Sequence, residues 1–455
     1  MRHRLAPLVL VAAVAAAVRT PGVYTQAFWQ DEVASARILS LGSLPAVLAR
    51  VARTESTPPL WYVLAWAVHQ AGVPLRDVRL LSVAAGAALA AATVVLARRF
   101  LDELPALAAG LLVALGGQFV AHGQELRAYE LLALLVVLFA LALLDEVEAP
   151  SRRREARLAL VTAAGGLTHY FFAFSVAAAL AWLWLDPAAR RARGRATGAI
   201  AAGGAVALAW APVALRQYHQ DRFWWIGSFR LRPVVAAPLR LFTFALNGTA
   251  AGLALSVAAV LVVAAGAFAL RRAPHGRLVS TLALGPLVAA GTAWAAGLQI
   301  YSLRNLIGIG PFVAATAAGG IAALPRRRLG IATAGALVAA VAVSLAVSEV
   351  GEVPPYDVMA RALISEGWKP SIPIAVYGNP LWYRGPLEWY LPRRPVLTLA
   401  RPRRSGCRVV LVVTRSGRVV RTRVHGSLRG ATFLGEAHDL PRCVRALPVR
   451  HAALA

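Results

Sequence analysis

Long apolar runs, separated by short polar segments, cover residues 5 to 348 of the chain. Each run reaches or approaches the ~20 residues that an α-helix needs to cross a bilayer. The pattern therefore predicts a bundle of membrane-spanning helices instead of a water-soluble core. The expected runs are 5–20, 78–97, 104–121, 128–144, 158–186, 196–215, 249–270, 278–297, 304–323 and 329–348.

The pattern changes after Val350. The tail from 351 to 455 is rich in Pro, Gly and Arg and contains short β-branched runs, such as residues 408–413. Runs of this length and composition are typical of strands. We therefore expect two parts, a transmembrane part over 1–350 and a small extracytoplasmic α/β domain over 351–455.

Composition agrees with the membrane prediction. Of the 455 residues, 58% are hydrophobic and only 15% are charged, against roughly a quarter charged in soluble domains. The net charge of +27 does not indicate a nucleic-acid partner, because the arginines form short clusters between apolar runs, where the positive-inside rule puts them. Lys369 is the only lysine, a bias that favours a GC-rich bacterial genome and hence a bacterial plasma membrane.

The arginine clusters also predict a topology. With a cytoplasmic start, all clusters lie inside if 158–186 is a short hairpin that enters and returns, and if 58–71 lies at the outer interface. This arrangement gives a polytopic α-helical protein with about eleven crossings and additional interfacial helices. No small-x-small cleavage site follows the first apolar run, so we expect a retained span there. The clusters are 98–99, 152–154, 190–191, 271–272 and 326–328.

Polar residues from separate loops meet at the outer face in this topology. Carboxylates beside a membrane are costly unless they serve a proton, a cation or a partner. Arginine binds phosphate in a bidentate way, aromatic rings pack on sugars, and a carboxylate accepts a proton from a hydroxyl. Together these groups suit an anionic lipid-linked sugar. The candidates are Asp31, Glu32, His122, Gln124, Glu125, Arg127, Tyr129, His169, Tyr170, Arg222, Trp224, Trp225, Tyr301 and Arg304.

Each of these residues also has a purely structural interpretation. The acidic pair at 31–32 can begin an interfacial helix, and Glu125 with Arg127 can be an ordinary loop pair. The tryptophans at 224–225 can form an interfacial belt, while Tyr301 and Arg304 can snorkel. The basic tail can attract the headgroups of anionic membrane lipids.

Two further possibilities stay open at this stage. Asp31 and Glu32, with His122 or His169, have the ligand types of a divalent metal site, so we expect no certain cofactor but a possible metal. Cys407 and Cys443 are the two cysteines, and an oxidising outer compartment permits a disulfide between them.

Six short sequence strings, taken in their order along the chain, resemble bacterial members of glycosyltransferase family 39. The family belongs to the GT-C superfamily, together with protein O-mannosyltransferases and the lipid A aminoarabinose transferase. The resemblance covers roughly residues 5 to 350. It implies a polyprenyl-phosphate-sugar donor, a lipid, glycan or protein acceptor, and transfer on the extracytoplasmic face. The strings are WQDEVASARIL, TPPLWYVLAWAVHQAG, HGQELRAYELLALL, LTHYFFAFSVAAAL, RFWWIGSF and YSLRNLIGIGPF.

The resemblance also implies roles for single residues. Asp31 matches the first-loop aspartate expected to act as base, and Glu32 matches its acidic neighbour, which positions the acceptor or contributes to a metal site. Arg127 and Tyr129 match a second outer motif. His169 matches a position at the hairpin tip. The late motif near the lipid phosphate matches Tyr301 and Arg304. Leu126, Ala128 and the absence of a nearby lysine depart from the family pattern.

Two other functional classes compete with the transferase. A transporter or lipid flippase would also need a polar cavity with buried charge. However, neither half of this chain resembles the other, and its charges gather at the ends of the spans. A non-catalytic scaffold, with the outer domain as its working part, is the third possibility.

Overall fold

The computed structural model describes residues 2–219, 226–243, 250–347, 356–365, 374–376, 380–391, 393, 397–402, 432–434 and 444–448. The chain divides into two compact units. The first unit comprises Met1–Val23 and Ile38–Val350, and the second comprises Tyr24–Arg37 and Gly351–Ala455.

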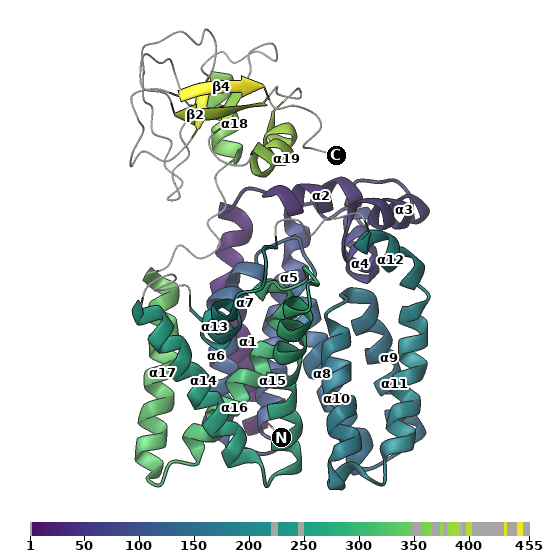
Figure 1. Ribbon diagram of the computed structural model, residues 1–455, viewed down its shortest axis with the longest axis vertical. Helices are drawn as coiled ribbons and strands as arrows, with labels where there is room; N and C mark the ends of the chain where they lie inside the picture. Colours follow the sequence, from purple (N-terminus) through teal and green to yellow (C-terminus); the bar gives the residue numbers. More distant parts are fainter. Residues whose placement is uncertain are drawn as a thin grey trace. The chain divides into compact units, whose positions relative to one another are not determined.

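The first unit consists of α-helices and short 3₁₀ segments (Figure 1). Its α-helices are α1 (Arg2–Thr25), α3 (Leu44–Thr54), α4 (Leu60–Gln70), α5 (Leu80–Ala97), α6 (Glu103–Leu115), α7 (Gly117–His122), α8 (Tyr129–Glu148), α9 (Arg152–Thr168), α10 (Phe172–Leu185), α11 (Arg193–Leu208), α12 (Ala211–Tyr218), α13 (Leu231–Arg240), α14 (Ala250–Leu270), α15 (Pro274–Ala295), α16 (Gly310–Ala322) and α17 (Arg327–Val347). The 3₁₀ segments are η1 (Asp77–Arg79), η2 (Pro187–Ala189) and η3 (Leu303–Ile309). Helix α2 (Gln30–Leu39) begins in the second unit and ends in the first.

Many of these helices have the length and composition of membrane spans. Six described segments are long and apolar enough to cross a bilayer, and a seventh is added if α11 and α12, which are bent by 61°, form one span. The expected count of about eleven crossings stays a prediction. The six segments are Leu5–Thr25, Asp77–Ala97, Ala250–Leu270, Pro274–Ala295, Leu303–Ala322 and Arg327–Val347.

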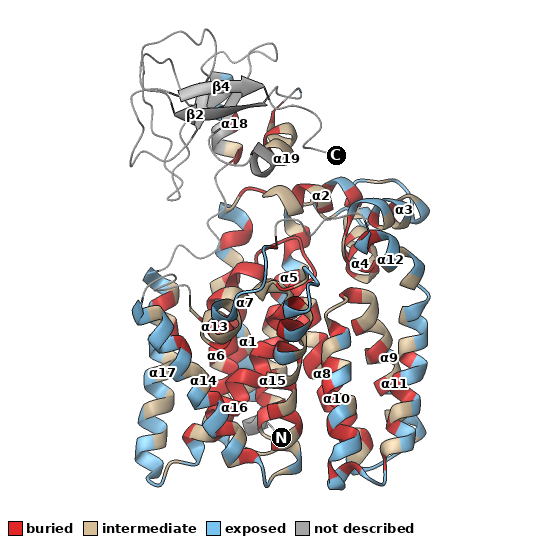
Figure 2. Ribbon diagram, in the orientation of Figure 1, coloured by how far each residue is buried: buried red, intermediate tan, exposed pale blue. Residues whose placement is uncertain are grey.

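The core of the first unit lies around α5, α6, α8 and α16, which are largely buried (Figure 2). Small residues let helices approach closely here. A Cβ added to Gly266 of α14 would lie 2.0 Å from the carbonyl oxygen of Thr316 in α16, so this contact requires glycine. Large apolar side chains such as Leu261 and Phe268 remain exposed on the outside, as expected for a surface that faces lipid.

Two expected runs are interrupted in the structure. Residues 104–121 form α6 and α7, separated at Gly116, whose extended backbone (ψ 129°) ends the helix. The freed amide of Gly117 donates to the carbonyl oxygen of Phe242 at 3.0 Å, which compensates the break. The run 196–215 is likewise divided into α11 and α12. Apolar composition predicted the runs but not these breaks.

Residues 158–186 are expected to form a short hairpin. In the structure they belong to two helices, α9 and α10, of which α9 begins earlier in the chain than expected, and both pack mainly against other helices. Helix α9 begins at Arg152, where the hydroxyl of Ser151 accepts a hydrogen bond from the Arg154 amide at 3.3 Å. Helix α9 then packs mainly against α8 and α11, whereas α10 packs mainly against α15. The two helices are joined by residues 169–171, so His169 does lie at the turn.

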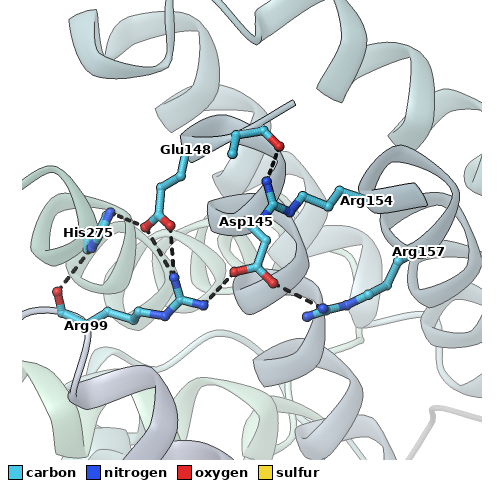
Figure 3. A network of polar contacts seen from close by, with 7 residues as sticks. Arg99, Asp145, Glu148, Arg154, Arg157 and His275 are labelled. Carbon is cyan, nitrogen blue, oxygen red and sulfur yellow. Dashed lines mark hydrogen bonds and ion pairs between the residues drawn. The ribbon is translucent and has the colours of Figure 1, made fainter. Parts of the chain in front are cut away.

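A network of ion pairs joins the helix ends furthest from this turn (Figure 3). The guanidinium of Arg99 contacts Asp145 at 2.5 Å and Glu148 at 3.0 Å, and Arg157 contacts Asp145 at 3.1 Å. His275 lies 2.9 Å from Glu148. Nearby carboxylates raise the pKa of Arg99 against the opposing effect of burial. The chain segments around Arg99, Arg157 and His275 thus share one end of the bundle.

The second unit contains a small sheet and two helices in its described residues. The sheet order is β3-β1-β2-β4, with β1 parallel to β2 and β3, and β2 antiparallel to β4. The register pairs Ala375 with Thr398 and with Phe433, and Ala400 with Ala446. The elements are α18 (Tyr356–Ser365), β1 (Ile374–Val376), α19 (Pro380–Tyr390), β2 (Leu397–Pro402), β3 (Thr432–Leu434) and β4 (Val444–Pro448).

Residues 24–37 belong to the same compact unit as this sheet and contact α19. The amide of Phe28 donates to the hydroxyl of Tyr390 at 2.7 Å, and Arg37 pairs with Glu388 at 3.2 Å. No local pattern in the sequence indicates this association. A separate domain over 351–455 outside the membrane stays a prediction, and Cys407 and Cys443 lie outside the described residues.

Candidate functional site

Arg127 is the centre of a buried polar cluster in the first unit. Its Nη1 donates to Glu55 Oε2 at 3.1 Å and to the Tyr62 hydroxyl at 3.0 Å. Tyr62 in turn donates to the same Glu55 oxygen at 2.6 Å. Burial raises the pKa of Tyr62 well above its usual value, so this hydroxyl stays protonated and can donate. The carboxylate of Glu55 thus pairs with Arg127, and the expected loop pair of Arg127 with Glu125 stays a prediction.

His122 and Glu125 form a second buried pair. His122 Nδ1 lies 2.9 Å from Glu125 Oε2, and both side chains are about nine-tenths buried. His122 Nε2 has no hydrogen-bond partner among the described residues. The hydroxyl of Ser82 donates to the carbonyl oxygens of Glu125 and Arg127, at 2.7 and 3.2 Å. This anchor fixes the irregular segment between α7 and α8 against α5.

His169 is held neutral. Burial, together with the charges of Arg127 and Arg304, lowers its pKa to about 3. The amide of Phe171 donates to His169 Nδ1 at 3.2 Å. Because Nδ1 accepts this bond, the ring proton of the neutral imidazole lies on Nε2. Nε2 can therefore act as a hydrogen-bond donor.

Tyr129 joins the remaining groups into one cluster. Its ring centroid lies 4.6 Å from that of His122 and 6.0 Å from that of His169. The guanidinium carbon of Arg304, in η3, lies 5.9 Å from the same ring. Segment η3 packs on α8, and this packing brings Arg304 to the site. Three of the six quoted strings thus meet around Tyr129.

An apolar cavity of about 350 Å³ adjoins the cluster at His169 and Tyr170. Its volume is within the range of ligand pockets. Burial raises the pKa of Tyr170 to about 12, so its phenol stays protonated, and it donates to Gln217 Oε1 at 2.6 Å. Gln217 also donates to the carbonyl oxygen of Val51 at 3.0 Å. The cavity is lined by Pro58, Thr162, Gly166, His169, Tyr170, Phe172, Ala173, Val176, Ile200, Gly204, Ala207, Leu208, Trp210, Ala211 and Ala214.

Asp31 and Glu32 occupy the first turn of α2, in the second unit. Glu32 is fully buried, and its Oε2 accepts a hydrogen bond from the Trp29 amide at 3.4 Å. Asp31 is half-buried. The acidic first turn agrees with a helix-start role.

Tyr301 does not join the cluster in the way that we expected. Its hydroxyl donates to the carbonyl oxygen of Pro233 at 3.0 Å, and its ring stacks on Trp294 at 4.7 Å. Burial raises its pKa above the usual value. Tyr301 thus supports α13 and α15, while Arg304 reaches the site. Gln124 lies against Gly22, and Arg222, Trp224 and Trp225 lie outside the described residues.

Sequence reasoning missed Glu55, Tyr62 and Ser82. One signal was available for Glu55, since it is the only acidic residue between Glu32 and Asp77. A lone carboxylate in a long basic and apolar stretch is a candidate partner for a buried arginine. Its partner Arg127 is too distant in the chain to be identified by spacing.

The described residues contain no group of three or more His, Cys, Asp or Glu side chains that could hold a metal ion. The expected set of Asp31, Glu32 and a histidine is therefore not assembled among them. Dependence on a divalent metal stays a prediction.

Known proteins resemble the chain in two ways. Residues 56–215 match the family described as dolichyl-phosphate-mannose-protein mannosyltransferase. No curated protein matches it in sequence. The fold is similar to that of ArnT from Cupriavidus metallidurans in the apo state, with a TM-score of 0.56 and 13% identity over 86% of this chain and 85% of ArnT.

Two ligand-bound structures are similar at comparable levels. ArnT from the same organism bound to undecaprenyl phosphate gives a TM-score of 0.52 at 14% identity, covering 86% of this chain and 85% of that one. The oligosaccharyltransferase AglB from Archaeoglobus fulgidus, in complex with an inhibitory peptide and a dolichol-phosphate, gives 0.51 at 14% identity, with coverage of 86% and 64%.

These similarities establish a multi-pass membrane fold. The family match spans the segment from α4 to α12, which carries Tyr62, Arg127, Tyr129 and His169. The fold similarity covers most of the chain. The resemblance to the glycosyltransferases of the GT-C superfamily is thereby confirmed.

Proposed function

We propose that this protein is a membrane glycosyltransferase that moves a sugar from a polyprenyl-phosphate donor to a hydroxyl acceptor. The reaction takes place on the extracytoplasmic face of a bacterial plasma membrane. The acceptor is a lipid, a glycan or a protein. The proposal rests mainly on one observation: a buried, neutral His169 lies in the field of two guanidinium groups, Arg127 and Arg304.

The electrostatics of the cluster suit the phosphate of the donor. Two cations disfavour the charged form of His169, so the same position attracts an anion. The neutral ring can donate from Nε2 to a phosphate oxygen. Arg304 is the second cation, and Arg127 is held in place by Glu55 and Tyr62. Guanidinium groups at this point stabilise the negative charge that grows on the leaving phosphate.

The adjoining cavity suits the prenyl chain of the donor. Its walls are largely apolar residues of α9, α10, α11 and α12, such as Phe172, Val176 and Leu208, and His169 also lines it. An isoprenoid chain gains free energy from apolar burial. A donor whose phosphate lies beside His169 and whose prenyl chain lies along these helices would use both the charged cluster and the apolar cavity.

The reaction is a single displacement. The bond between the anomeric carbon and the phosphate oxygen breaks, and its electron pair leaves with polyprenyl phosphate. The acceptor oxygen forms the new glycosidic bond from the opposite face of the sugar, and its proton passes to the carboxylate of Asp31. Glu32 supports that carboxylate. The configuration inverts, so a β-linked donor gives an α-linked product.

The orientation follows from the two ends of the bundle. The arginine clusters of the network in Figure 3 lie at one end, and the positive-inside rule assigns that end to the cytoplasm. Residues 122–129 and His169 lie at the other ends of the same helices, α8 and α9. The proposed site is therefore extracytoplasmic.

The decisive experiment incubates the purified protein with a panel of radiolabelled polyprenyl-phosphate sugars and membrane-extracted acceptors, with and without chelator. We expect release of polyprenyl phosphate and a labelled product whose anomeric configuration is opposite to that of the donor. Asp31→Asn should abolish transfer while leaving thermal unfolding unchanged. Unchanged transfer in this variant would remove Asp31 from the mechanism.

The same samples distinguish the competing classes. A flippase would move the labelled lipid between the leaflets of a vesicle without forming a glycosidic bond. A scaffold would do neither. Retention of configuration in the product would contradict the single displacement.

A further inference from the structure

A second cavity lies at the other end of the bundle, beside the segment that joins α14 to α15. Its volume is about 380 Å³, and it is bounded by α10, η2, α14 and α15. Arg277 in its wall is neutralised, because it pairs with Asp186 through Nη2 and Oδ1 at 2.7 Å. This pairing lowers the pKa of Asp186. The lining residues are Ala181, Trp182, Leu185, Asp186, Pro187, Ala267, Arg271, Arg277, Ser280 and Thr281.

Arg271 differs from Arg277 in the same cavity wall and from the arginines of the ion-pair network. Arg99, Arg157 and Arg277 each contact a carboxylate. Arg271 instead donates to the carbonyl oxygen of Phe268 at 2.5 Å, and its guanidinium carbon lies 3.5 Å from the Phe268 ring centroid. Among the described residues no carboxylate forms an ion pair with it. The cavity thus has an exposed cation whose charge is not compensated.

Ser280 gives a second, independent indication of a ligand. A serine in a helix commonly donates back to the carbonyl four residues earlier, as the neighbouring Thr281 does to Arg277 at 2.8 Å. The hydroxyl of Ser280 is buried and has no hydrogen-bond partner among the described residues. The residue is about nine-tenths buried and lines the cavity. An unsatisfied buried hydroxyl is costly, and an acceptor in the cavity would satisfy it.

The surroundings of the cavity are apolar and exposed. Leu185 is 81% exposed and Phe268 is 65% exposed, and each lies in a helix that borders the cavity. In a membrane protein such side chains contact acyl chains. A ligand here would therefore meet a cation, one hydroxyl donor and two lipid-facing walls.

We infer that this cavity binds an anionic glycerophospholipid of the surrounding leaflet. Arg271 contacts the phosphate, Ser280 donates to an ester carbonyl of the glycerol backbone, and the acyl chains lie along Leu185 and Phe268. The inference does not depend on the proposed glycosyl transfer, since it concerns different residues at the opposite helix ends. It assigns a lipid-binding role to one arginine of a cluster that otherwise only orients the chain.

The test measures binding of phosphatidylglycerol to the full-length protein. Purified protein in phosphatidylcholine nanodiscs, with and without phosphatidylglycerol, is re-extracted, and retained lipid is quantified by mass spectrometry. We expect selective retention of phosphatidylglycerol by the wild type. Arg271→Ser should weaken it about tenfold, which corresponds to ~1.4 kcal/mol, because an arginine-phosphate contact is lost.

Arg272→Ser is the matched control, since it removes the same charge from the next residue, which does not line the cavity. It should leave retention unchanged. If both variants lose phosphatidylglycerol retention equally, the lipid is attracted by diffuse charge and the inference is overturned. Equal retention of phosphatidylglycerol and phosphatidylcholine by the wild type would also overturn it.

A cavity-filling variant tests the site without changing charge. Ala267 lines the cavity and is only partly buried. Ala267→Trp should displace the lipid as strongly as Arg271→Ser does, whereas Ser280→Ala should weaken retention less. Unchanged retention in Ala267→Trp, with thermal unfolding like that of the wild type, would show that the lipid binds elsewhere.

Discussion

The two ends of the helical bundle are both rich in arginine, but they use it differently. In the network of Figure 3, Arg99 and Arg157 are partly exposed and share the carboxylate of Asp145. At the opposite end, Arg127 is buried with one carboxylate, and Arg304 lies over an aromatic ring beside a neutral histidine. The two ends therefore differ in how far their arginines are buried and in what those arginines contact, more than in the number of charges. The partly exposed, paired arginines orient the chain, and Arg127 and Arg304 belong to the candidate binding site.

The largest expected difference between the ends concerns turnover. Arg304→Gln should lower kcat by about 10²–10³-fold, the cost typical of removing one group that stabilises charge in the transition state. Arg157→Gln, in the network at the other end, should leave kcat unchanged. Both are measured with the labelled donor assay. Equal effects of the two variants would remove the functional distinction between the ends.

Stability should show the next largest effect. Arg127→Met leaves Glu55 buried without its cation, and breaking a buried ion pair in this way costs ~3–5 kcal/mol. The double variant Arg127→Met with Glu55→Gln should recover much of that loss, because no charge is left uncompensated. Thermal unfolding in detergent measures both variants. A double variant as unstable as the single one would show that the charge of Glu55 is not the cause.

His169 should give the candidate site a characteristic pH dependence. Its pKa is about 3 in the folded protein against an ordinary value of 6.5. The unfolded chain therefore binds a proton at pH values where the folded protein does not, and stability is full above pH 6.5 and falls as the pH approaches 3.

The check is the unfolding temperature of the wild type and of His169→Asn between pH 7 and pH 4. The variant should lose less stability on acidification, since it lacks the titrating ring. His219→Asn, at an exposed position, should behave like the wild type. Parallel curves for all three proteins would contradict a neutral, buried His169.

The smallest effect is expected in the charged network. Arg157 is about half exposed, and a solvent-exposed ion pair contributes ~0–1 kcal/mol. Arg157→Ala should therefore shift the unfolding temperature little, and high salt should reduce the shift further. A loss comparable to that of Arg127→Met would contradict the comparison between the two ends.

Sequence reasoning predicted the parts of the fold and site that depend on local pattern. Apolar runs predicted the helices, and the string around Arg127 and Tyr129 predicted a polar segment before α8. Long-range partners were not predictable. Glu55 lies 72 residues from Arg127, and no periodicity relates positions so far apart. Sequence proximity suggested Glu125, two residues away, whose carboxylate pairs with His122.

The composition of the chain also did not predict where helices break or which distant segments associate. The break at Gly116 occurs within a predicted apolar run, and the amides that follow it donate to carbonyl oxygens just after α13. The association of residues 24–37 with α19 depends on contacts of Phe28 and Arg37 with the distant residues Tyr390 and Glu388. Tyr301 was grouped correctly in sequence with Arg304 but faces α13.

The turn between α9 and α10 has a mechanical consequence. Helix α9 is seated against α8 and α11, while α10 is seated against α15, and only residues 169–171 connect them. We therefore expect a shift of one helix relative to the other to move His169, whose ring accepts a hydrogen bond from the Phe171 amide within this link. The position of the imidazole would then depend on the relative position of α9 and α10 along their axes.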